Sequence, residues 1–162
     1  MVMRSSMMLL IPFGGRVRCW NMRISDFGLD ANHAARADAV CRALDLLRTT
    51  DRRRFDRLLR DVDRILLLPS SKFAGQYWAF SKTVVLSSVS VEREETLSIA
   101  MTIVHEATHA RLTSAGVPFL GKEERSERCC VDEEIAFAER VPGSARLIEG
   151  AKMKLDSRYW NS

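Results

Sequence analysis

Residues 105 to 109 spell His-Glu-Ala-Thr-His, an HExxH pattern, and are the residues of this sequence best suited to chemistry. Residues four apart lie on one face of a helix, so the imidazoles of His105 and His109 can reach one ion. Zinc accepts neutral imidazole nitrogens and lowers the pKa of a bound water to about 7. Glu106 projects about 100° around the helix from His105, where its carboxylate can take a proton from that water. The pattern predicts a Zn²⁺ cofactor and a hydrolase with Glu106 as its base.

The segment around the motif is predicted to be a long helix, from about residue 91 to residue 113. Ser88 or Ser90 is its expected start, with glutamates in the first turn, and Gly116 and Pro118 are expected to end it. The apolar run 99–104 directly precedes the motif and would bury the helix, which would fix the ligands. The alternative is a pair of histidines hydrogen-bonded in the core. Burying His, Glu and His together in a low-dielectric core without a metal is costly, which disfavours this alternative. The third histidine, His33, is expected to have no functional role.

A zinc site of this kind needs a third protein ligand and one open position. The extension HExxHxxGxxH is excluded, because Leu112 and Ala115 stand where it requires glycine and histidine. No EGC cysteine motif precedes the HExxH. Candidate donors are glutamates of the next predicted helix, from about residue 122 to residue 140. They are Glu127, which lies eighteen positions after His109, Glu133 and Glu134.

These three glutamates stay open as the third ligand on spacing alone. Glu127 and Glu134 are seven positions apart and share one helix face, whereas Glu133 is better explained as part of a solvated face. Cys130, three residues after Glu127, is a small side chain that would let this helix approach the HExxH helix closely.

With these residues the chain resembles the gluzincins, the thermolysin-like HExxH zinc metallopeptidases, and especially their minimal single-domain members. The resemblance covers roughly residues 63 to 140. It implies an α+β, zincin-like fold, in which a small mixed sheet packs on the HExxH active-site helix and on a following ligand-bearing helix. It implies His105, His109 and a downstream glutamate as metal ligands. An edge strand, assigned here to residues 83–87, would pair with an extended peptide substrate.

One departure from the gluzincin pattern is Val131, which stands where the family often has aspartate four positions after the ligand glutamate; Asp132 is adjacent. The family also uses a histidine or tyrosine to donate a hydrogen bond to the reaction's oxyanion. Tyr77 and Tyr159 are the tyrosines available, and each is better explained as a packing residue.

Composition indicates one domain, over residues 16–162, after a ragged leader at residues 1–15. The net charge is +4 and the densest basic stretch is 52–64. That stretch also carries aspartates, so that Asp56 and Arg60, and Arg57 and Asp61, lie four apart, as on a solvated helix face. A nucleic-acid patch is the alternative, and the favoured prediction is no nucleic-acid partner.

The four cysteines form no CxxC pair, which favours free thiols in a reducing compartment and a cytoplasmic location. The apolar stretch 7–13 is too short to span a bilayer, so no membrane contact is expected.

Other predicted elements are a strand at 16–24, a helix at 31–47 capped by Asp30, a short helix from Asp51, a strand at 65–68, a hairpin of 75–80 and 83–87 that turns at Ser81-Lys82, and a helix at 145–155.

These observations favour a metallopeptidase that acts on a peptide or protein substrate. The alternative is a catalytically silent zinc-binding domain of the same fold, with a regulatory or interaction role.

Overall fold

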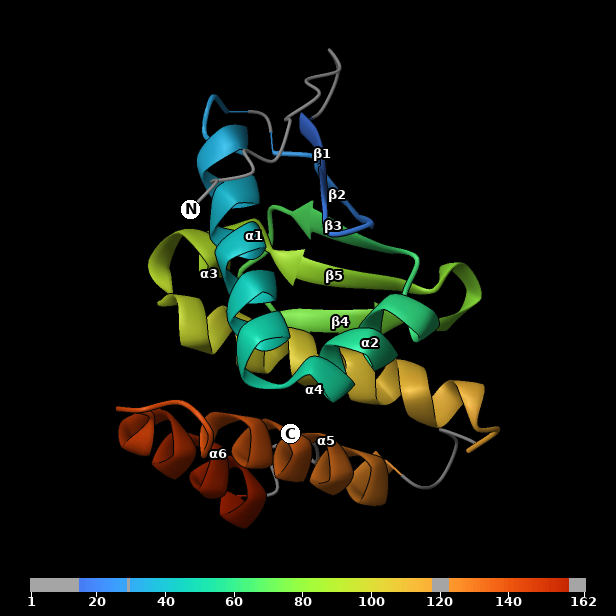
Figure 1. Ribbon diagram of the computed structural model, residues 1–162, viewed down its shortest axis with the longest axis vertical. Coiled ribbons are helices and arrows are strands. Elements are labelled where there is room, and N and C mark those ends of the chain that lie inside the picture. Colours follow the sequence, from blue (N-terminus) through green and yellow to red (C-terminus); the bar gives the residue numbers. More distant parts are fainter. Residues whose placement is uncertain (1–14, 29, 118–122, 158–162) are drawn as a thin grey trace.

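A five-stranded mixed sheet and six α-helices make up the part of the chain that the computed structural model describes, residues 15–28, 30–117 and 123–157 (Figure 1). The α+β class expected from the sequence is therefore confirmed. The strands are β1 (Gly15–Cys19), β2 (Met22–Asp26), β3 (Arg64–Leu68), β4 (Gly75–Trp78) and β5 (Thr83–Ser87). The helices are α1 (His33–Thr50), α2 (Arg52–Asp61), α3 (Ser88–Arg93), α4 (Thr96–Ser114), α5 (Glu123–Ala138) and α6 (Ala145–Ser157), and a short 3₁₀ turn, η1 (Ala79–Ser81), joins β4 to β5.

The sheet has the order β1-β2-β3-β5-β4. Its three central strands, β2, β3 and β5, run parallel, while β1 and β4 pair antiparallel to their neighbours at the two edges. The predicted hairpin of β4 and β5 is confirmed, but the choice of 83–87 as the edge strand was wrong. All of β5 is buried because it pairs on both sides, whereas the Gly-Gln-Tyr-Trp segment of β4 is only partly covered.

The predicted single strand at 16–24 is a β-hairpin. Trp20 and Asn21 form its turn with φ angles of 52° and 71°, the positive values that a tight two-residue hairpin turn requires. The turn restarts the alternation of buried side chains, so Val17 and Cys19 before it and Met22 and Ile24 after it are all buried. In the sequence, the apolar positions change from odd numbers (Val17, Cys19) to even numbers (Met22, Ile24), and this change indicated the turn.

The predicted continuous helix at 91–113 is two helices, α3 and α4, because Glu94 and Glu95 adopt extended backbone angles between them. The cap of α3 is Ser87 rather than Ser88 or Ser90, and its hydroxyl accepts a hydrogen bond from the Ser90 amide at 3.1 Å. The short helix predicted from Asp51 is confirmed as α2, and Asp51 caps it, with its carboxylate accepting from the Arg54 amide.

Asp30 does not cap α1, which begins at His33 with Asn32 in the cap position. The Asp30 carboxylate instead pairs with Arg36, a side chain that is only 2% exposed. Arg36 also binds Asp26 at the end of β2 and Glu92 in α3. This ion-pair group therefore links the sheet to two helices.

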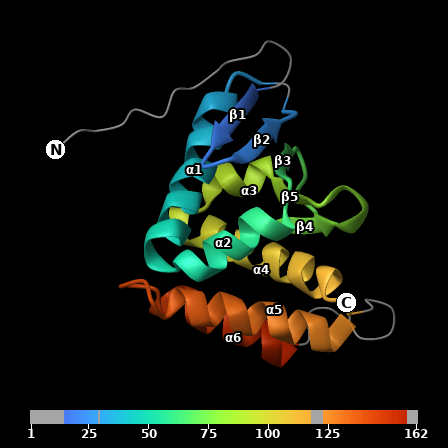
Figure 2. The same cartoon turned by 45° about the vertical axis from the view of Figure 1, so that its right-hand side comes forward.

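Helix α4 passes beneath the sheet, and α5 and α6 form a further layer on the other side of α4 (Figure 2). One apolar core joins these layers, with fully buried members such as Leu44, Leu58, Ile65, Ile103 and Phe137. Because α4 lies in the middle, its polar residues are held between the sheet and α5. Among the described helices, none is long and apolar enough to cross a membrane. Residues 1–14 of the predicted leader, and Pro118 at the predicted helix end, lie outside the described residues.

Candidate metal centre

Helix α4 places His105, Glu106 and His109 in the interior of the protein. The helix also buries Ile103 and Val104 just before the motif, which anchors this part of α4 in the core. The exposed fractions are 9% for each histidine and 6% for Glu106. The two imidazole rings lie edge to face with their centroids 5.0 Å apart. The i and i+4 spacing therefore brings both rings together, as the sequence predicted.

Glu127 of α5 lies against both rings. One of its carboxylate oxygens, Oε2, is 3.2 Å from His105 Nε2, and the other, Oε1, is 3.2 Å from His109 Nε2. The same nitrogen of each ring thus faces one carboxylate. A site for a cation is expected where two imidazole nitrogens and a carboxylate converge in this way.

Glu134, seven residues further along α5, contacts the opposite side of the His105 ring. Its Oε1 atom lies 2.5 Å from His105 Nδ1, and the side chain is 4% exposed. A hydrogen bond to Nδ1 fixes the ring's orientation and leaves Nε2 as the nitrogen able to bind a metal. Glu134 and Glu127 therefore contact different atoms of the same histidine.

Glu133 is not brought to the centre. Its carboxylate pairs with Arg54 at 2.6 Å and with Arg111 at 3.3 Å, so it joins α5 to α2 and to the end of α4. Asp132 is exposed. The sequence predicted a solvated face for Glu133, but its side chain is half-buried between these arginines of two other helices.

Cys130 joins the centre, and sequence reasoning missed it as a donor by treating it only as a small packing residue. Its side chain is fully buried, and Sγ lies within 4.8 Å of ligand nitrogens of His105 and His109, which themselves lie within this distance of each other. These three residues could hold a metal ion. The available signal was spacing, because Cys130 follows Glu127 by three residues and so shares its helix face.

The electrostatics of the centre favour a bound cation. Burial raises the pKa of Glu106 above its ordinary value, although both neighbouring histidines act in the opposite sense. Burial alone would lower the pKa of His105, but hydrogen bonds with Glu127 and Glu134 outweigh it and raise this pKa to about 10. The carboxylates around the two rings therefore stabilise positive charge at this position.

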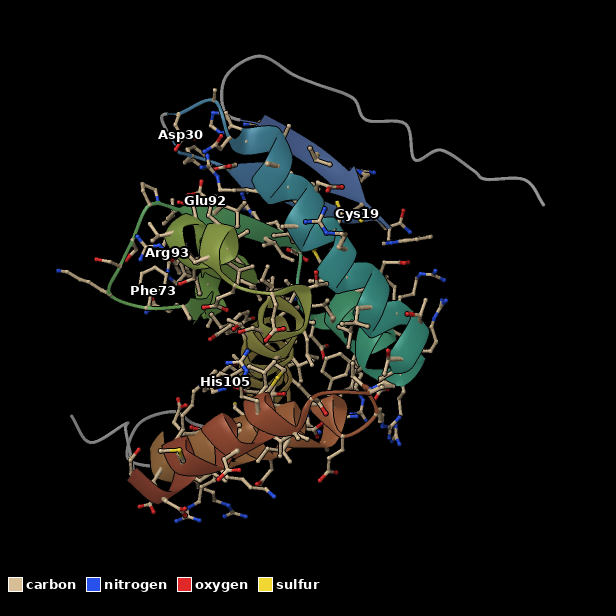
Figure 3. The ribbon with its side chains drawn as sticks, turned by 90° about the vertical axis from the view of Figure 1, so that its left-hand side faces the viewer. Cys19, Asp30, Phe73, Glu92, Arg93 and His105 are labelled. Atoms are coloured by element: carbon tan, nitrogen blue, oxygen red, sulfur yellow. The ribbon has the colours of Figure 1, made fainter. Side chains whose placement is uncertain are left out.

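A cavity of about 600 Å³ opens onto the centre. His105, Glu106 and His109 line one wall and β4 with the preceding loop lines another, while Lys154 reaches it from α6. In Figure 3, His105 extends from α4 toward the space bordered by the α5 and α6 layer, and Phe73 lies on the loop before β4. The cavity thus leaves room for a ligand beside the histidines.

Gly75 brings the backbone of β4 unusually close to the motif. A Cβ atom at this position would lie 2.6 Å from Thr102 Cγ2 and 2.9 Å from Glu106 Oε1. A larger residue would therefore displace either the edge strand or the glutamate. Tyr77 also lines the cavity, whereas Tyr159 lies outside the described residues.

His33 is placed away from the other two histidines. Its Nδ1 atom lies 3.2 Å from Asp26, within the ion-pair group around Arg36. This contact joins the start of α1 to the end of β2.

Comparison with known proteins adds nothing to this picture. No protein-family model, no curated protein and no solved structure matches the chain. Functional inference therefore depends on the geometry and chemistry of the centre.

Proposed function

We propose that this protein is a zinc-dependent hydrolase that cleaves peptide bonds, with His105, His109 and Glu127 as zinc ligands and Glu106 as general base. The observation that carries the proposal is the convergence of both histidine Nε2 atoms on the Glu127 carboxylate, 3.2 Å from each, beside a cavity that Glu106 also lines. Two imidazoles and one carboxylate form a known donor set of catalytic zinc.

The residues present fit a zinc ion. Both imidazoles present Nε2 to the Glu127 carboxylate, and the Glu134 carboxylate at His105 Nδ1 is the kind of supporting contact that orients a ligating histidine. A zinc ion there would supply Lewis acidity, which lowers the pKa of water to about 7 and polarises a substrate carbonyl. The open cavity leaves a position for substrate.

Glu106 would hold and move the proton. Its burial raises its pKa, so its carboxylate is a stronger base than that of an exposed glutamate. After taking a proton from the attacking water, the same carboxyl group would return that proton to the leaving amine. The backbone of Gly75 lies close to Glu106 and limits the positions that the Glu106 side chain can adopt.

The edge strand β4 would bind the substrate backbone. This strand pairs with β5 on one side, and its residues Gly75, Gln76 and Tyr77 line the cavity. An extended peptide can add to such an edge by main-chain hydrogen bonds. The sheet with its antiparallel edge strand, the HExxH helix and the glutamate-bearing helix together support a zincin-like fold of gluzincin type.

The test is the variant Glu106→Gln, compared with wild type for zinc content and for cleavage of an unfolded casein-like substrate. We expect unchanged zinc content and a loss of about 10²–10⁴-fold in cleavage rate, the usual contribution of a general base. Glu139→Gln, at an exposed position just after α5, is the matched control and should cleave normally. Undiminished cleavage by Glu106→Gln would remove Glu106 from the reaction.

A second candidate function is a zinc-binding domain without turnover, and Cys130 is the observation that favours it. A thiolate added to His105, His109 and Glu127 would complete four protein ligands, and closed four-ligand sites are structural. Zinc bound tightly by the wild type, together with no cleavage in a diverse peptide library, would support this function over hydrolysis.

A further inference from the structure

A group of arginines gathers where α2, α4 and α5 meet, on the side of α4 that carries Thr108 and Arg111. Figures 1 and 2 show α2 alongside α4 above α5. From the sequence, the arginines of α2 were expected to pair with aspartates four residues away. The two pairings expected, Asp56 with Arg60 and Arg57 with Asp61, were wrong, because Asp61 accepts hydrogen bonds from Arg60 at 2.8 Å and Asp56 accepts one from Arg52.

The acidic groups beside this arginine group are already engaged. Glu133 pairs with Arg54 at 2.6 Å and with Arg111 at 3.3 Å. Asp51 pairs with Arg54 and, at 3.1 Å, with Arg140. The two carboxylates of Glu133 and Asp51 are thus shared among the guanidinium groups of three arginines other than Arg57.

Arg57 is compensated less, because the nearby Glu133 is itself paired with Arg54 and Arg111. Its side chain is half-buried, and no described residue forms a salt bridge with it. Burial lowers the pKa of Arg57, and the nearby positive charges of Arg53 and Arg111 lower it further, while the charge of Glu133 acts in the opposite sense. Arg57 remains charged at neutral pH, because an arginine side chain loses its proton only at a pH far above neutral. Positive charge therefore accumulates at this position.

A small hollow of about 20 Å³ lies between these side chains, lined by Arg54, Arg57 and Arg111 together with Thr108 and Glu133. This volume is enough for one water-sized group. An oxyanion could place one oxygen in the hollow and keep its other oxygens at the surface. Guanidinium groups offer paired N–H donors that match phosphate oxygens.

We propose that this hollow is a binding site for a phosphate-type oxyanion, held by Arg57 and Arg111, with the nearby charge of the exposed Arg53 attracting it. The ligand is either a free phosphate group or the phosphate of a nucleic-acid backbone, which share this chemistry. The site uses none of the residues of the metal centre and does not depend on the proposed hydrolysis.

The test is calorimetric titration of the full chain at low ionic strength, with inorganic phosphate in one arm and a short single-stranded oligonucleotide in the other. Wild type should bind at least one probe saturably. Arg57→Gln should weaken this binding by about tenfold or more, as expected for the loss of a charge-assisted contact. Arg53→Gln, at an exposed position with little risk to folding, should weaken it to a smaller extent.

Arg52→Gln is the matched control, since Arg52 lies on the same helix, carries the same charge and pairs with Asp56 on the exposed side. It should bind like wild type. Binding of phosphate alone identifies a free phosphate group as the ligand. Oligonucleotide binding that depends on Arg57 identifies the nucleic-acid backbone. Absence of binding by wild type, or an equal loss in Arg52→Gln and Arg57→Gln, would overturn the proposal.

Discussion

His105 Nδ1 and Glu134 Oε1 lie 2.5 Å apart, on the side of the ring opposite Glu127. This contact distinguishes two glutamates between which sequence spacing alone could not decide. Glu127 faces the nitrogens that a metal would use, and Glu134 faces the nitrogen that fixes the ring. The proposal that Glu127 is the ligand, and Glu134 the residue that orients His105, follows from this difference.

Glu134→Gln should therefore weaken zinc binding without abolishing it. An amide at this position is a weaker acceptor for His105 Nδ1, and loss of such supporting contacts typically costs about 10–100-fold in metal affinity. Competition with a chromophoric zinc chelator measures the affinity. Asp132→Asn, an exposed position on the same helix, serves as control and should bind zinc like wild type. A complete loss of zinc in Glu134→Gln would instead make Glu134 a ligand.

The roles of Glu127 and Cys130 can be separated with cobalt in place of zinc. A thiolate ligand gives Co²⁺ an intense near-ultraviolet charge-transfer band, whereas carboxylate and imidazole ligands do not. If Glu127 is the third ligand, Glu127→Ala should lose most metal affinity, and the wild-type cobalt spectrum should lack this band. Cys130→Ala should then keep its metal. A strong thiolate band that disappears in Cys130→Ala would assign the ligand to Cys130 and support the silent zinc-binding domain.

Gly75→Ala should lower the cleavage rate while zinc content stays normal. The added Cβ would lie 2.9 Å from Glu106 Oε1 and 2.6 Å from Thr102 Cγ2, so Glu106 or β4 must shift. Gly150→Ala in α6 is the control, because a Cβ there meets nothing within 4 Å. Steady-state kinetics and zinc content measured on both variants check the prediction. Equal rates in the two variants would show that the approach of β4 does not position Glu106.

Asp26→Ala should lower the free energy of unfolding by about 3–5 kcal/mol, the usual effect of removing one partner from a buried ion pair. Asp26 is fully buried, accepts from Arg36 Nε at 2.6 Å and also accepts the Gly28 amide. Urea unfolding followed by circular dichroism measures the change. Asp38→Ala removes an exposed i,i+4 pair with Arg42 and should change stability by less than about 1 kcal/mol. Similar values for the two variants would contradict a structural role for the Asp26 pair.

Much of the fold could be predicted from local patterns. Helical spacing located α1, α2, α5 and α6 to within a few residues, and the hairpin of β4 and β5 followed from its two apolar runs. Sheet order could not be predicted, because the parallel pairing of β3 with β5 is a long-range contact that leaves no local signal. The edge strand was assigned wrongly for that reason.

The metal centre could be predicted in part. The pairing of His105 and His109 followed from helix geometry, since both residues belong to one element. Distinguishing Glu127 from Glu134 required the angle between α4 and α5, which sequence spacing does not contain. Cys130 was overlooked for the same reason, although its spacing from Glu127 placed both residues on one face.

Zinc titration of the metal-free protein tests the central claim most directly. We predict that wild type binds about one equivalent of zinc tightly, and that His109→Ala, which removes one of the two imidazoles, loses this binding while it stays folded by circular dichroism. The expected loss follows from the placement of His109 Nε2 beside Glu127. Failure of the wild type to take up zinc, or tight binding that persists in His109→Ala, would contradict the account.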